Sequence, residues 1–125
     1  TEIYMKKIQQ IDKKKKGLIY DSQKCFSRFL KYEFKEHFSF DVYKNFKNFD
    51  DELDKYTFML FVVYSDQELI DLLRIYRRGV PLIVSTLNQD IKLKLEKIED
   101  ILLFDSSKIK SEMRTELRFF INTVT

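Results

Sequence analysis

The fold is decided by one stretch of the chain, Phe58-Met59-Leu60-Phe61-Val62-Val63-Tyr64-Ser65-Asp66-Gln67-Glu68, in which a continuous apolar run passes directly into a helix start. The run is β-branched toward its end, which suits a strand covered on both faces of a parallel sheet. Ser65 and Glu68 have the spacing of a capping box, in which each side chain satisfies a free amide at the helix start. The stretch therefore predicts a buried strand over 58–64 and a helix that Gly79 terminates.

Short apolar runs and helical stripes alternate on both sides of this stretch. Before it, the pattern predicts strands over 17–20 and 40–46, a helix over 22–38 between them, and a short helix over 48–55. The strand over 40–46 is the less apolar of the two, which places it nearer an edge. After it, we expect strands over 82–87 and 101–104, a helix capped by Asn88, and a last helix that begins at Ser106 or Ser107 and ends at Val124. Five such units predict one α/β domain with a doubly wound parallel sheet and helices on both faces.

Charge divides the 125 residues into two parts. Residues 1–16 form a basic N-terminal segment with six Lys against two acids, and residues 17–125 form the nearly neutral α/β domain. Lysines 13–16 directly precede the first strand, where a run of like charge most often keeps the chain soluble. We therefore do not expect nucleic acid as a partner, and contact through these lysines is the weakest of the alternatives.

Several chemistries are excluded by the residues that they require. Cys25 is the only cysteine and His37 the only histidine, which rules out an intrachain disulfide and a multi-histidine metal centre. Gly17 and Gly79 begin no phosphate-binding loop. We expect no cofactor, no metal and no enzymatic activity. Because the longest apolar stretch has seven residues and no N-terminal run resembles a signal peptide, we expect a cytoplasmic protein with no membrane partner.

Residues at the ends of the expected strands carry a resemblance to a known family. Asp21-Ser22 follows the first strand, Val62 lies near the end of the third, Thr86 lies at the end of the fourth, and Phe104-Asp105 ends the fifth. In the order of its elements and the placement of these positions, the chain over 16–124 resembles the receiver domain of bacterial response regulators. The resemblance implies a flavodoxin-like strand order of 2-1-3-4-5 and functional loops at the carboxyl ends of the strands.

At the positions that take phosphate in that family, this chain departs from the pattern. Asp21 is the one acid left of an acidic pair, Val62 stands in place of the phosphoacceptor aspartate, and Phe104 in place of a lysine, while Thr86 matches the family's hydroxyl. Aspartyl phosphorylation needs a carboxylate nucleophile, an oxygen-bound divalent cation and a positive charge near the phosphoryl group. The sequence therefore predicts a pseudo-receiver, a non-catalytic signalling module that works by protein contacts without phosphorylation.

The resemblance also implies where a protein partner would bind. Receiver-like domains exchange surfaces along their fourth and fifth helices, so we expect a protein partner or a homodimer there. Residue types favoured in interfaces mark the candidate surface, namely Tyr76, Arg77, Arg78, Arg114, Arg118 and Phe119. The alternative is a small-ligand or nucleotide-binding module that uses the crevice at the strand ends around Asp21, Ser22, Ser65 and Thr86.

Overall fold

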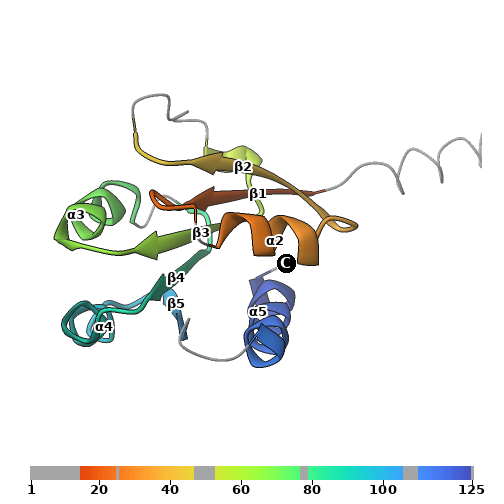
Figure 1. Ribbon diagram of the computed structural model, residues 1–125. Helices are drawn as coiled ribbons and strands as arrows, with labels where there is room; N and C mark the ends of the chain where they lie inside the picture. Colours follow the sequence, from red (N-terminus) through yellow and green to blue (C-terminus); the bar gives the residue numbers. More distant parts are fainter. Residues whose placement is uncertain (1–14, 25, 47–52, 77–78, 106–109, 125) are drawn as a thin grey trace, which may run out of the picture.

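Five parallel strands form one sheet in the computed structural model, which describes residues 15–24, 26–46, 53–76, 79–105 and 110–124. The strand order is β2-β1-β3-β4-β5, which confirms the predicted flavodoxin-like fold (Figure 1). The strands are β1 (Lys15–Tyr20), β2 (Phe38–Tyr43), β3 (Phe58–Val63), β4 (Leu82–Thr86) and β5 (Ile101–Asp105). The helices are α2 (Ser27–Glu33), α3 (Asp66–Ile75), α4 (Gln89–Leu95) and α5 (Lys110–Val124), and η1 (Leu53–Lys55) is a 3₁₀ turn.

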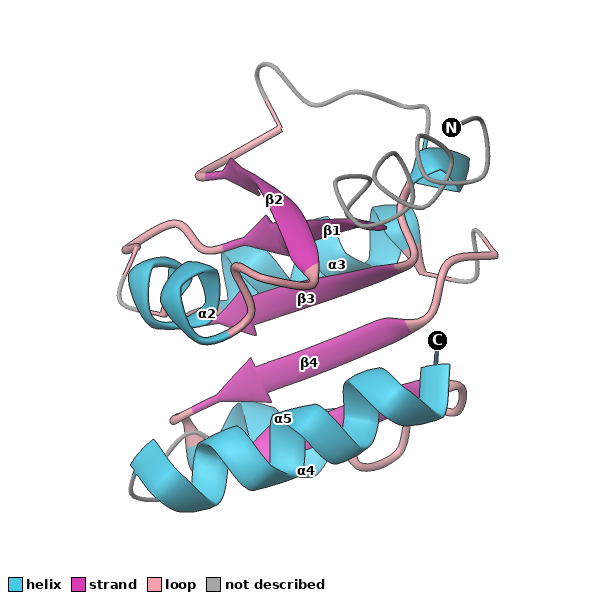
Figure 2. Ribbon diagram, turned by 90° about the vertical axis from the view of Figure 1, so that its right-hand side faces the viewer, coloured by secondary structure: helices cyan, strands magenta, loops and turns pink. Residues whose placement is uncertain are grey.

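Helices of the described residues cover the sheet on both faces (Figures 1 and 2). Leu72 of α3 and Leu95 of α4 belong to one apolar cluster, whereas Leu30 of α2 and Leu117 of α5 belong to the other. Strand β3 lies at the centre with all six residues buried, as its continuous apolar sequence requires. The two clusters fix the direction of every β3 side chain, since successive residues of a strand point to opposite faces.

The first helix is shorter than the predicted span of 22–38. It begins at Ser27, because the carboxylate of Asp21 accepts hydrogen bonds from the amides of Phe26 and Ser27 and so satisfies the helix start from outside the helix. Lys24 has a φ of 56°, which no α-helix tolerates in its interior. The helix ends at Glu33, and Phe38 is already the first residue of β2.

Smaller differences concern the other boundaries. Strand β2 covers 38–43 instead of 40–46, and it is an edge strand as predicted. Of the short helix expected over 48–55, only the turn at 53–55 falls within the described residues. Helix α3 ends at Ile75, before Gly79, which has a φ of 89° in the connection to β4. Strand β1 begins at Lys15, two residues before the expected domain boundary, and Cys25, Ser106 and Ser107 lie outside the described residues.

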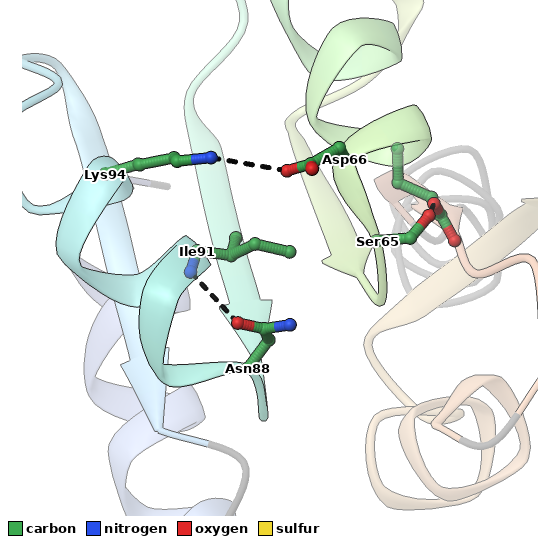
Figure 3. Close-up of polar contacts among 6 residues, drawn as sticks. Ser65, Asp66, Asn88, Ile91 and Lys94 are labelled. Atoms are coloured by element: carbon green, nitrogen blue, oxygen red, sulfur yellow. Dashed lines mark hydrogen bonds and ion pairs between the residues drawn. The ribbon is translucent and has the colours of Figure 1, made fainter.

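The two predicted caps on the α3/α4 face have different outcomes. Asn88 caps α4 as expected, because its Oδ1 accepts from the amide of Ile91 at 3.1 Å (Figure 3). The capping box at α3 is wrong in its bonding, since the Ser65 side chain caps no amide and its hydroxyl donates to the carboxylate of Glu68 instead. The two helices are also joined by an exposed ion pair between Lys94 and Asp66, with a Nζ–Oδ1 distance of 3.4 Å.

Candidate functional site at the carboxyl ends of the strands

Four residues form a row across the sheet where the strands end, on the face covered by α2 and α5. Strand pairing places Val62, Ser85 and Phe104 abreast on β3, β4 and β5. Because Tyr20 pairs with Phe61, Asp21 stands one position further, beside Val62. We call Asp21, Val62, Ser85 and Phe104 the strand-end row. It brings together three of the five pocket positions that the sequence predicted.

Asp21 is the only charged member of the row, and its carboxylate is fully buried. Its Oδ2 accepts from the backbone amides of Phe26 at 2.8 Å and Ser27 at 3.2 Å, and its Oδ1 accepts from the hydroxyl of Tyr64. Both oxygens are thus engaged by donors of the protein itself.

The rest of the row is apolar or neutral. Val62 and Phe104 are each 2% exposed and pack in the α2/α5 cluster. The hydroxyl of Ser85, between them, is buried and has no hydrogen-bond partner among the described residues. A phosphoryl group or a divalent cation placed here would meet two hydrocarbon surfaces, and burying such an ion without oxygen or nitrogen partners is costly.

Thr86 does not join this row, although the sequence placed it in the pocket. It pairs with Val63, one position further along, and therefore points to the α3/α4 face. Its hydroxyl donates to the backbone oxygen of Val63 at 2.7 Å and accepts from the amide of Asn88 at 3.1 Å. The hydroxyl abreast of Val62 is that of Ser85, which the sequence analysis did not single out, although the alternation of β4 side chains could have indicated it.

Ser22 and Ser65, the remaining crevice candidates, are joined through an acid on α3. The hydroxyl of Ser22 donates to Glu68 Oε1 at 2.9 Å, and that of Ser65 donates to Oε2 of the same carboxylate. Glu68 is buried, so this bridge ties the loops after β1 and β3 to α3. The hydroxyls proposed for a ligand are thus already bonded within the protein.

A third buried carboxylate lies one turn further along α3. Asp71 accepts from the hydroxyl of Tyr20 at 2.7 Å and from Nε2 of Gln67 at 3.3 Å. Burial, reinforced by the hydrogen bond to Asp71, raises the pKa of the Tyr20 hydroxyl above its ordinary value, so this donor stays protonated at neutral pH. The contacts of Asp21, Glu68 and Asp71 are therefore made by neutral donors, and they connect β1 and β3 to the helices.

The described members of the expected interaction set come from the end of α3 and from α5. Arg114 is partly exposed and paired with an acid of α2, where its Nη2 donates to Glu33 Oε1 at 2.9 Å and its Nε lies 2.6 Å from Oε2 as a close ion pair. The hydroxyl of Tyr76 donates to the backbone oxygen of Glu99. Arg118 and Phe119 are exposed on α5, Phe119 to 67%. Arg77 and Arg78 lie outside the described residues.

Strand β5 and its two flanking helices form an exposed side of the molecule. The outer edge of β5 pairs with no strand of the described residues, and Ile101, Leu102 and Leu103 on it are half-buried. A cavity of about 160 Å³ opens there. It is lined by Thr86, Lys92, Leu103, Phe104 and Glu116. Lys92 comes from α4 and Glu116 from α5, so opposite charges flank the edge strand.

Comparison of the sequence with protein-family models and with curated proteins found no match. Over the described ranges, no three His, Cys, Asp or Glu side chains are grouped so that they could hold a metal ion. No helix in the same part of the chain is both long enough and apolar enough to cross a bilayer.

Proposed function

We propose that this chain is a pseudo-receiver, a non-catalytic and phosphorylation-independent module that works in cytoplasmic signalling by binding other proteins. The observation that carries the proposal is the strand-end row. Its single acid, Asp21, is buried and used by the protein as a helix cap, and its neighbours Val62 and Phe104 are apolar. These residues offer neither a phosphoacceptor nor a place for the cation that acyl-phosphate chemistry needs.

The side formed by α4, β5 and α5 is the surface that we assign to partners. Leu93 on α4 is 59% exposed and Phe119 on α5 is 67% exposed, with the half-buried edge strand β5 between them. Exposed aromatic and aliphatic side chains around a partly apolar strand are typical of binding surfaces. Of the residues predicted for this role, Arg118 and Phe119 are exposed on α5.

A second copy of the chain is one partner that this side fits. A two-fold axis parallel to β5 would exchange its two faces and set α4 of one copy against α5 of the other. Lys92 of each copy would then lie near Glu116 of its partner, because the two residues flank β5 on opposite helices. Opposite charges that meet across a two-fold axis favour such a pairing over others.

Sedimentation equilibrium and affinity capture with a Phe119→Asp variant test the proposal. Ile70→Asp is the matched control, since Ile70 is also exposed, to 52%, but lies on α3. We expect Phe119→Asp to abolish self-association or capture of the partner, and Ile70→Asp to leave both intact. Equal behaviour of the two variants, in a chain that does bind a partner, would show that the α4–β5–α5 side is not the interaction surface.

A further inference from the structure

The outer face of α2 carries cations around an exposed aromatic ring. The helix turns Ser27 and Leu30 into the core. Its exposed residues are Arg28, Lys31 and Tyr32. Lys31 and Tyr32 follow Arg28 by three and four residues, so the three share one face of the helix. Lys35 is exposed just past the end of the helix. The Tyr32 side chain is 68% exposed, and Lys35 Nζ lies 4.6 Å from its ring centroid.

Acids do not neutralise this face. Glu33 turns to the other side of α2, where it pairs with Arg114 of α5. In the described part of the chain, no carboxylate forms an ion pair with Arg28, Lys31 or Lys35. Glu36 is the one exposed acid beside them, which leaves three cations against one anion.

The start of β1 extends the positive charge. Lys15 and Lys16 are both exposed, and Lys15 is paired with Phe38, three residues after Lys35. The amino end of β1 therefore lies beside the chain segment that leaves α2 (Figure 1). The lysines before the domain gave no reason by themselves to expect a nucleic-acid partner, but the folded chain adds an aromatic side chain and a second row of cations.

We propose that the outer face of α2 binds single-stranded nucleic acid, with the phosphates on Arg28, Lys31 and Lys35 and a base stacked on Tyr32. Non-specific single-strand binding combines these two elements, a row of cations that follows the backbone and an aromatic ring that any base can stack on. The cations complement the charge of a polyanion, and the exposed tyrosine supplies the stacking surface. This surface is separate from the α4–β5–α5 side, so the proposal does not depend on the proposed function.

An anionic membrane would also attract the cations, but the rest of the face does not suit it. Peripheral binding to a bilayer buries large apolar side chains next to the basic ones. Among the described residues, the exposed large aliphatic side chains lie elsewhere, namely Ile70 and Leu73 on α3, Leu87 after β4 and Leu93 on α4. On the α2 face the exposed large apolar group is the ring of Tyr32. Its hydroxyl and the charges beside it favour a polar, hydrated partner.

Fluorescence anisotropy of a labelled oligothymidylate of about twelve nucleotides tests the proposal with the full chain. If the three cations contact the strand, raising the salt from about 50 to 200 mM should weaken binding roughly 20-fold. Arg28→Glu with Lys31→Glu should weaken binding at least about tenfold and flatten its salt dependence. Tyr32→Ala should cost roughly tenfold, and Tyr32→Phe should bind like the parent, because the ring does the stacking.

The matched control is Lys94→Glu with Lys97→Glu, which changes the net charge equally but at the end of α4. Its binding should stay within about threefold of the parent, because only long-range charge is altered. Thermal melts followed by circular dichroism confirm that every variant is folded. Equal losses in both double variants, no effect of Tyr32→Ala, or failure of the parent to bind would each overturn the proposal. If the parent co-sedimented with phosphatidylserine-rich vesicles but did not bind the oligonucleotide, the α2 face would be assigned to a membrane instead.

Discussion

Replacing Asp21 by Asn separates a structural acid from a functional one. The change keeps the shape of the side chain but removes its charge and one of its two acceptor oxygens. Two charge-assisted hydrogen bonds, from the amides of Phe26 and Ser27, become neutral ones, at a cost of about 1 kcal/mol each. The amide group cannot accept from Tyr64 at the same time without turning a donor toward the helix start. We therefore expect Asp21→Asn to lower the free energy of unfolding by about 2–3 kcal/mol.

The sign of the effect matters more than its size. Asp21 is fully buried, and burying a charge costs free energy unless hydrogen bonds compensate for it. If that cost dominated, as in a site kept ready for a cation, removal of the charge would stabilise the fold. Destabilisation is expected only if the hydrogen bonds to Asp21 outweigh the cost of burying its charge. A neutral or stabilising effect of Asp21→Asn would refute the assignment of this acid to a helix cap.

Urea unfolding followed by circular dichroism measures the change, with the free energy extrapolated linearly to water. Asp66→Asn is the control, because Asp66 is exposed and makes only a surface ion pair, so its loss should cost less than about 1 kcal/mol. Tyr64→Phe and the double variant complete a cycle, in which we expect a coupling energy between Tyr64 and Asp21 of about 1 kcal/mol or more. We expect magnesium to leave the free energy of unfolding of the parent unchanged. A cation that bound only the folded state would raise that free energy.

The remaining predictions concern the strand-end row and the first strand. Incubation with acetyl phosphate and magnesium should leave the intact mass unchanged, because Val62 has no nucleophile; a stoichiometric hydroxylamine-labile adduct on Asp21 or Asp66 would contradict this. Val62→Asp should destabilise the fold by about 1–3 kcal/mol and magnesium should not restore it, since both oxygens of the neighbouring Asp21 already accept hydrogen bonds and Phe104, beyond Ser85, offers no ligand; recovery of stability with magnesium would contradict this expectation. Gly17→Ala should cost about 1–3 kcal/mol, because its Cβ would lie 2.8 Å from the Phe40 ring, and Phe40→Leu in the same chain should recover part of the loss; an unchanged urea midpoint would show that the ring moves freely.

The sequence was sufficient where the decisive interactions are local or purely apolar. The run over 58–63 is buried on both faces, and its continuous apolar sequence predicted a central strand without knowledge of the topology. Asn88 caps α4 through an amide three residues away, and that bond depends on no other element. The alternation of strands and helices predicted the fold class, whereas the strand order was what the family resemblance implied, and the structure confirms that order.

Prediction failed where a side chain finds its partner in another element. Ser65 and Glu68 have the spacing of a capping box, but Glu68 also accepts from Ser22, which lies 46 residues earlier in the chain. With the carboxylate held there, the Ser65 hydroxyl donates to it and leaves the helix amides uncapped. The start of α2 was misplaced for a similar reason, since the Asp21 carboxylate is buried with the hydroxyl of Tyr64, a residue of the loop after β3.

The position of the pocket hydroxyl shows how one residue of register decides what a site contains. Ser85 and Thr86 are adjacent and both carry hydroxyls, so the sequence does not say which of them faces the end of β3. Successive side chains of a strand point to opposite faces of the sheet. Because Ser85 pairs with Val62, its side chain points to the α2/α5 face. Thr86 then lies on the other face, where it bonds to the backbone of Val63 and Asn88 and helps to begin α4. In this chain the hydroxyl at the pocket, that of Ser85, is therefore buried between Val62 and Phe104. Neither of these apolar side chains could bind a phosphoryl group or a divalent cation.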